Sequence, residues 1–99
     1  MNITYLHSIC KKARKEAAQS FYLKIMNPLW ELDDSIIEIE IQDMKQTIGQ
    51  SVYKKMLNEF DLTVPQLKVM EQITNSYIDV AVNRGRKFAE SLVKPPNQS

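Results

Sequence analysis

Residues 36–60 read IIEIEIQDMKQTIGQSVYKKMLNEF, and this stretch decides the fold class. Apolar side chains recur in it at steps of four, three, four, four and four residues: Ile37, Ile41, Met44, Ile48, Val52 and Met56. This spacing places them on one stripe of an α-helix, which has about 3.6 residues per turn. The apolar face is widened by Tyr53, Leu57 and Phe60. The pattern therefore predicts a long amphipathic helix.

The beginning of this stretch is also compatible with a β-strand. Residues 37–41 alternate Ile-Glu-Ile-Glu-Ile, which is the period of a strand with one buried face. A lone five-residue strand has no other strand in the chain to pair with, so we expect a helix here. Ser35 and Glu38 occupy the two positions of a capping box. They predict that the helix begins with Ser35 as its N-cap.

The flanking segments show the same helical period. Between residues 2 and 27 the apolar stripe comprises Leu6, Cys10, Ala13, Ala17, Phe21 and Ile25. Pro28 is expected to end this helix near Asn27. After residue 62 the stripe comprises Leu67, Met70, Ile73, Tyr77, Ala81, Phe88 and Leu92. Thr63 and Gln66 predict a capping box where this third helix begins.

Gly85 falls on the third stripe and allows two interpretations. Either it permits close contact between helices, or residues 83–86 break the third helix in two. In both cases the chain is all-α, and its short connectors make consecutive helices antiparallel. We therefore expect an up-down-up bundle of three long amphipathic helices over residues 1–94. The prolines at 95 and 96 predict that residues 95–99 form a flexible tail.

Composition excludes several classes of protein. Apolar residues make up 43% and charged residues 25% of the chain, which is close to the average of globular proteins. No apolar run is long enough to span a membrane, and the N-terminus lacks the features of a signal peptide. Cys10, the single cysteine, is expected to be buried and has no partner for a disulfide. We expect a cytoplasmic protein with no membrane contact.

Groups that carry catalysis are scarce. His7 is the only histidine, and its place near the N-terminus predicts an exposed surface side chain. Two glycines do not suffice for a phosphate-binding loop, and no Cys–His cluster is present for a metal. We therefore expect no enzyme activity and no cofactor. The carboxylates of residues 31–43 are expected to stabilise a helix N-terminus, with Glu40 and Asp43 on a solvated flank. An acidic docking patch is the alternative.

Charge is distributed in three blocks. Residues 1–27 carry a net charge of +4, residues 28–62 carry −5 and residues 63–99 carry +2. An acidic middle helix between two basic helices predicts that the blocks pair with one another. The alternative is a nucleic-acid surface, in which phosphates contact Lys11, Lys12, Arg14, Lys15, Arg84, Arg86 and Lys87. In an up-down-up bundle these two clusters lie toward opposite ends of one subunit.

Three aromatic residues are candidates for contacts with another protein, because Trp and Tyr are frequent at the centre of interfaces. Trp30 either caps the core or anchors a partner, and Tyr22 and Tyr53 lie off the main stripes. The apolar faces exceed what a thin bundle of 99 residues is expected to cover.

The leading hypothesis is therefore a small non-catalytic helical interaction protein. It would be a regulator, inhibitor, immunity protein or assembly adaptor that binds a partner protein or homodimerises. The alternative hypothesis is a regulator that binds nucleic acid through the two basic clusters.

Overall fold

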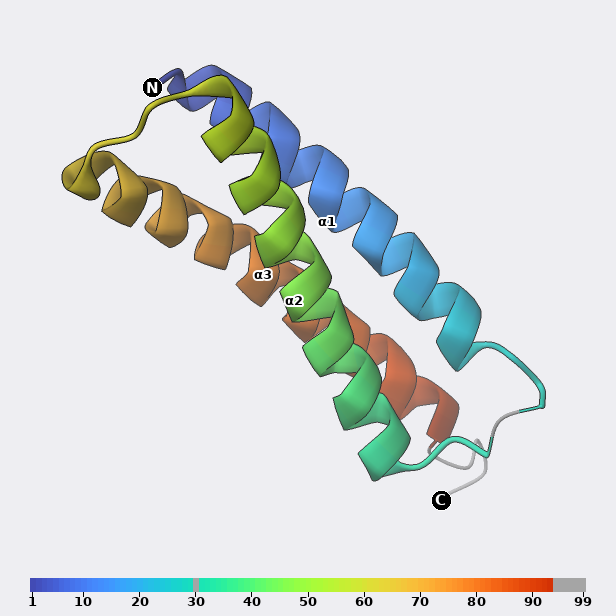
Figure 1. Cartoon of the computed structure of the whole chain (residues 1–99). Helices are drawn as coiled ribbons and strands as arrows, with labels where there is room; N and C mark the ends of the chain where they lie inside the picture. The colour runs from blue at the N-terminus through green and yellow to red at the C-terminus, as the bar shows by residue number, and fades with distance from the viewer. Residues whose placement is uncertain (30, 94–99) are drawn as a thin grey trace.

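The stripe of residues 37–56 lies on the second of three α-helices in the chain (Figure 1). The computed structural model describes residues 1–29 and 31–93. In it, α1 spans Ile3–Ile25, α2 spans Asp34–Glu59 and α3 spans Val64–Val93. The described residues contain no strand, and residues 37–41 belong to α2, so the all-α prediction is confirmed. The predictions for Trp30 and for the tail at 95–99 concern residues outside these ranges.

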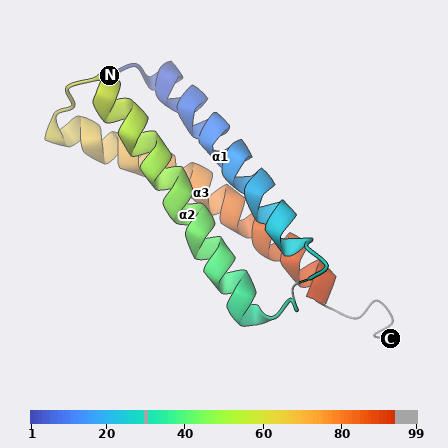
Figure 2. The ribbon, with the colours of Figure 1, turned by 45° about the vertical axis from the view of Figure 1, so that its right-hand side comes forward.

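The helices run up, down and up along a rod of 53 × 25 × 20 Å. Figures 1 and 2 show α1 and α2 side by side and antiparallel, with α3 crossing behind them. The start of α1, the end of α2 and the start of α3 share one end of the rod. The connector between α1 and α2 lies at the other end, together with the end of α3. The predicted topology is confirmed.

The core is built from the predicted stripes of α1 and α2. The buried residues of α1 are Leu6, Cys10, Ala13, Ala17, Phe21 and Ile25. Those of α2 are Ile37, Ile41, Met44, Ile48, Val52 and Met56. Cys10 is fully buried, as predicted, and burial raises the pKa of its thiol because the thiolate is poorly solvated there.

The buried face of α3 agrees with the predicted one only at Met70, Ala81 and Gly85. It consists of Met70, Thr74, Ile78, Ala81, Gly85 and Ala89. Four of the predicted residues flank this face half-buried: Leu67, Ile73, Tyr77 and Phe88. Leu92, in the last turn of α3, is 47% exposed. Small residues occupy the centre of the contact because the helix backbones approach closely there, so bulky side chains fit only at its edges.

α3 continues through Gly85 without a break. A Cβ atom at this position would lie 3.2 Å from Cε2 of Phe21 and 3.2 Å from Cε of Met44. The missing side chain therefore makes room for α1 and α2 at the same place. The close-contact interpretation of Gly85 is confirmed, and a helix break at residues 83–86 is wrong.

Local capping determines where two of the helices begin. The predicted capping box of α3 is present: Gln66 N–H donates to Thr63 Oγ1 at 3.3 Å, and Thr63 N–H donates to Gln66 Oε1 at 3.0 Å. The predicted cap of α2 is wrong, because Asp33 rather than Ser35 is its N-cap. The Asp33 carboxylate accepts from Ile36 N–H at 3.0 Å and from the Ser35 hydroxyl at 2.7 Å. A carboxylate gains more than a hydroxyl from the positive end of the helix dipole.

The packing around Gly85 generates a stability prediction. We expect Gly85→Val to lower the free energy of unfolding by about 1–3 kcal/mol, because the new methyl groups displace Phe21 and Met44. Gly49→Val is the matched control, since nothing lies within 4 Å of a Cβ atom there. Its free energy of unfolding should stay within about 0.5 kcal/mol of the original, because Val and Gly differ little in helix propensity. Urea unfolding followed by circular dichroism measures the free energy of unfolding of both variants. Equal decreases in the two variants would contradict the close approach of the helices at Gly85.

Candidate functional site

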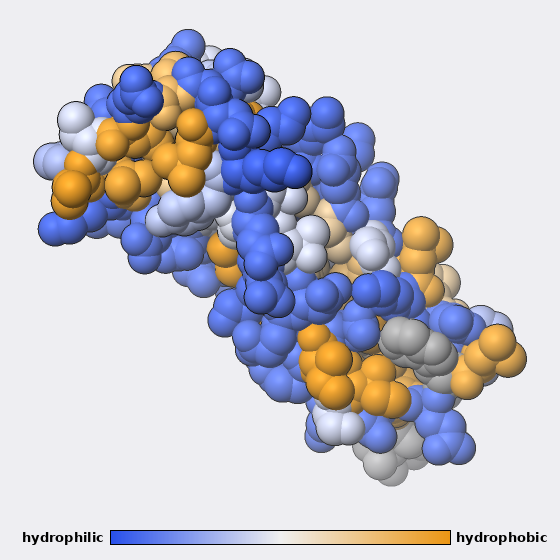
Figure 3. Space-filling model, viewed as in Figure 1, coloured by the Kyte–Doolittle hydropathy of each residue, from blue (hydrophilic) through white to orange (hydrophobic). Residues whose placement is uncertain are grey.

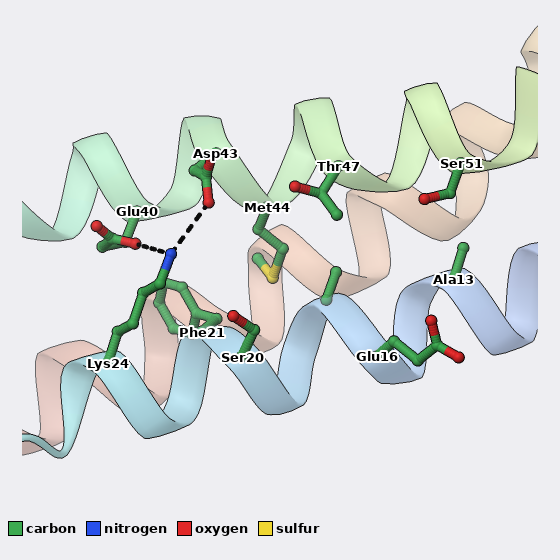
Figure 4. Close-up of a pocket in the computed structure, with 11 residues that line it drawn as sticks. Ala13, Glu16, Ser20, Phe21, Lys24, Glu40, Asp43, Met44, Thr47 and Ser51 are labelled. Atoms are coloured by element: carbon green, nitrogen blue, oxygen red, sulfur yellow. Dashed lines mark hydrogen bonds and ion pairs between the residues drawn. The ribbon is translucent and has the colours of Figure 1, made fainter. Parts of the chain in front are cut away.

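A groove runs between α1 and α2 (Figure 4). Its larger hollow, of about 760 Å³, is lined by Tyr5, Ser8, Ile9, Lys12, Ala13, Glu16, Ser51, Lys54, Lys55, Asn58 and Glu59. A smaller hollow of about 110 Å³ lies further along α1, between Ala13 and Lys24. Ala13, Glu16 and Ser51 line both hollows, so the two form one continuous groove. Short side chains on both helices keep it open.

Ion pairs close one end of the groove. Lys24 Nζ lies 3.2 Å from Glu40 Oε1 and 3.3 Å from Asp43 Oδ2, as Figure 4 shows. Hydrogen bonds to these two carboxylates raise the pKa of Lys24. The Glu40 side chain is only 13% exposed. The prediction of a solvated flank is therefore wrong for Glu40, because α1 covers it.

A third ion pair joins α2 to α3. Arg86 donates from Nη1 to Glu38 Oε2 at 2.6 Å and from Nη2 to Glu38 Oε1 at 3.0 Å. These bonds, followed by one from Gln42, lower the pKa of Glu38 to about 2. Glu38 therefore pairs across helices instead of closing a capping box. Every ion pair found in residues 1–29 and 31–93 joins acidic α2 to a basic neighbour, as the charge blocks predict.

The candidate phosphate-binding residues lie in two separate places. Lys11, Lys12 and Lys15 are exposed on α1, and Arg84 and Lys87 are exposed on α3. Arg14 is half-buried, with its guanidinium carbon 5.1 Å from the centre of the Tyr77 ring. Nine residues of continuous helix, about 13 Å, separate Tyr77 from Arg86. The two basic clusters therefore do not form one continuous surface on a single molecule.

His7 is half-buried, so the prediction of an exposed histidine is wrong. Its Nδ1 lies 2.7 Å from the hydroxyl oxygen of Tyr77, and the two rings meet edge to face. Tyr77 lies near the middle of α3, so this contact joins the second turn of α1 to α3 and partly covers His7. Sequence spacing gave no signal for this contact because the two residues are 70 positions apart.

The three aromatic candidates have different surroundings. Tyr22 is half-buried and packs edge to face on Phe88 of α3, with ring centroids 4.8 Å apart. Its ring therefore holds α1 to α3. Tyr53 is 37% exposed on α2. Trp30 lies outside the described residues.

Apolar side chains are exposed at both ends of the rod (Figure 3). We call the set beside the α1–α2 connector the connector patch: Met26, Leu29, Ile39, Leu92 and Val93. The opposite end exposes Ile3, Tyr53, Leu57, Val64 and Val69. In the view of Figure 3, hydrophilic surface covers most of the rod between the two ends. Sequence reasoning predicted surplus apolar surface but did not place it at the ends.

The Arg86–Glu38 pair generates a pH prediction. The Glu38 carboxyl should titrate with a pKa of about 2, and Arg86→Gln should return that pKa toward the ordinary value of 4.5. Because the pKa is lower in the folded protein, the pair stabilises the fold fully above pH 4.5. That stabilisation is lost as the pH falls toward 2. Carboxyl ¹³C NMR titration measures the pKa of Glu38 in the original protein and in Arg86→Gln. A pKa that stays at about 2 in Arg86→Gln would contradict the pairing. Gln42→Ala should raise the pKa less.

The remaining features of the site are negative ones. The described residues hold no group of three His, Cys, Asp or Glu side chains placed to bind a metal ion. No helix in residues 1–29 and 31–93 is long and apolar enough to cross a membrane. Comparisons of the chain with protein-family models, with curated proteins and with solved structures found no match.

Proposed function

We propose that the protein is a non-catalytic interaction protein that binds a partner protein through the connector patch. Exposure of the patch carries the proposal: Leu29 is 89% exposed, and Met26 and Ile39 are each 64% exposed. Large apolar side chains exposed at one end of a molecule are frequent in protein-binding sites.

The connector presents Leu29 in an ordered way. Leu29 N–H donates to the side-chain oxygen of Asn27 at 3.0 Å, which holds the backbone in a tight turn after α1. This restraint reduces the backbone entropy that is lost when a partner covers the side chain. Ordered exposure of an apolar side chain supports a binding role for this turn.

Acidic side chains beside the patch indicate the chemistry of the partner. Glu31, Asp33 and Asp34 are exposed in the connector and at the start of α2. An apolar centre with a charged rim is the usual build of a protein interface, and opposite charges speed association. The surface that fits is an apolar pocket bordered by Lys or Arg. A regulator, inhibitor, immunity protein or assembly adaptor acts by occupying such a surface. The compartment we propose is the reducing cytoplasm, which suits a buried free cysteine.

Site-specific photo-crosslinking tests this function. A photoreactive amino acid at Leu29 is expected to give one discrete adduct with a second protein in cells that make this protein. The same amino acid at Gln50, an exposed position in the middle of α2, is the control and should give none. Equal background at both positions would contradict the proposal.

A substitution then measures the contribution of the patch to affinity. With the crosslinked protein purified, Leu29→Ser should weaken binding at least about tenfold, because a buried Leu contributes roughly 1.5–3 kcal/mol. Val64→Ser, at the opposite end and 67% exposed, is the matched control. Isothermal titration calorimetry measures both variants.

Nucleic-acid binding is the second candidate function. It is favoured by the exposed lysines of α1, since Lys11, Lys12 and Lys15 project from neighbouring turns. Lys54 and Lys55 line the same groove as Lys12, so five ammonium groups lie on or beside α1. Such a cluster attracts phosphates without reading base sequence.

Salt dependence tests the second candidate. If the three α1 lysines contact phosphates, a plot of log affinity against log salt should have a slope of about −3 for duplex DNA. Changing all three to Glu should abolish binding. Fluorescence anisotropy with a labelled duplex at low salt measures this, and no binding at about 20 mM salt would exclude the candidate.

A further inference from the structure

The larger hollow of the groove is a concave surface whose lining comes from α1 and α2 alone. α3 crosses on the opposite side of this helix pair, so the hollow opens to the outside of the bundle. Its α1 side runs from Tyr5 to Glu16, which is about 16 Å or three helical turns. Its α2 side runs from Ser51 to Glu59. The hollow therefore has the length and direction of a short helix.

The floor of the hollow is apolar and lined by small side chains. Ala13 of α1 is buried and faces Ser51 of α2 across the groove, as Figure 4 shows. Ile9 is half-buried and lines the same hollow. The Tyr5 ring packs edge to face on Phe60, with 5.7 Å between the ring centroids, so it forms a fixed wall at one end. A side-chain ridge of another helix fits a floor of this kind.

The sides of the hollow carry ammonium groups. Lys12, Lys54 and Lys55 line it and are exposed. None of the three takes part in the ion pairs found in residues 1–29 and 31–93. The surrounding sequence is basic on both helices, because residues 3–15 and residues 44–58 contain no Asp or Glu. The middle of the hollow therefore attracts negative charge.

Two carboxylates limit where the negative charge of an occupant can lie. Glu16 lines one end of the hollow and Glu59 lines the other. Like charges in contact repel, so acidic groups at either end of an occupant are disfavoured. Ser8 and Asn58 also line the hollow, are exposed and offer neutral hydrogen-bond donors. The occupant that fits has an apolar stripe and carboxylates gathered near its middle.

We propose that the α1–α2 groove binds an acidic amphipathic helix of a partner protein. The apolar stripe of this helix packs on Ile9 and Ala13. Its central carboxylates bind between Lys12 on α1 and the two lysines of α2, Lys54 and Lys55. A helix laid into a groove with its apolar face inward is a recurring mode of peptide recognition. The bound helix completes a four-helix arrangement in which α1 and α2 are covered on both sides.

The same observations disfavour a nucleic acid as the occupant of the groove. A phosphate backbone carries charge at every nucleotide, so it would meet Glu16 or Glu59 as well as the lysines. Proteins that bind single strands stack bases on exposed aromatic rings. The Tyr5 ring is half-buried and already packed on Phe60. The apolar floor also has no use in binding phosphates, whereas an amphipathic helix covers it.

The inference goes beyond the proposed function of the connector patch. It concerns another surface and a partner of opposite charge, so each proposal can fail without the other. A helix of about three turns makes a small contact, which belongs with weak and reversible interfaces of less than about 1,200 Å². We therefore expect affinity in the micromolar range.

A designed peptide tests the charge of the groove. The probe is a fluorescein-labelled peptide of three heptads, with Leu along one stripe, Glu beside it in the central heptad, and Ala and Gln elsewhere. Fluorescence anisotropy at about 0.15 M salt, where charges beyond about 8 Å are screened, should give a Kd below about 100 µM. Lys54→Glu with Lys55→Glu should raise the Kd at least about tenfold.

The matched control for charge is Lys68→Glu with Lys87→Glu. It makes the same change in net charge at two exposed positions of α3, away from the groove. Its Kd should stay within about twofold of the original, because salt screens distant charges. Circular dichroism checks that each variant keeps its helices.

A second pair of variants tests the shape of the groove with its charge unchanged. Ser51→Trp fills the floor opposite Ala13 and should raise the Kd of the peptide at least about tenfold, because the apolar stripe no longer fits. Gln50→Trp is the control, since Gln50 is the exposed neighbour that does not line the groove. It should leave the Kd unchanged.

Three results would overturn the inference. The first is no binding of the peptide at about 100 µM. The second is a Kd that neither Ser51→Trp nor the double lysine variant changes, because the peptide would then bind elsewhere. The third is equal binding of a peptide with Ser in place of Leu, or tighter binding of a labelled DNA duplex at the same salt, which would assign the lysines to phosphates. Leu29→Ser should leave the peptide Kd unchanged, which keeps this test separate from that of the connector patch.

Discussion

Close packing of Phe21 and Met44 against Gly85 is the contact on which the arrangement of the three helices depends. These residues come from α1, α2 and α3, and they meet because Gly85 has no side chain to separate them. Ala81 and Ala89, one turn to either side on α3, are also buried and extend the close approach. The first turns of α3 diverge from the other two helices in Figure 1, and Val64 there is 67% exposed. The tilt of α3 thus follows from where its small residues stand.

Charge defines which neighbour each flank of α2 meets. Lys24 of α1 binds Glu40 and Asp43 on one flank, and Arg86 of α3 binds Glu38 on the other. Exposed ion pairs contribute little to stability one by one. Together they favour the register in which the carboxylates of α2 meet basic side chains of α1 and α3. Once these carboxylates are paired, the remaining charges of the groove are those of Lys12, Glu16, Lys54, Lys55 and Glu59.

Local sequence determined the three helices, the buried faces of α1 and α2 and the Thr63–Gln66 cap, because these depend on residues a few positions apart. Tertiary structure decided the rest. Part of the α3 stripe was misplaced because spacing favours bulky apolar residues, whereas close approach selected Thr74 and Ala89 beside the predicted Gly85. Sequence did not predict four features: the partners of His7 and Glu38, the groove and the exposure of Leu29. One physical reason explains all four. What covers a side chain comes from segments far away in the chain, and only packing brings those segments together.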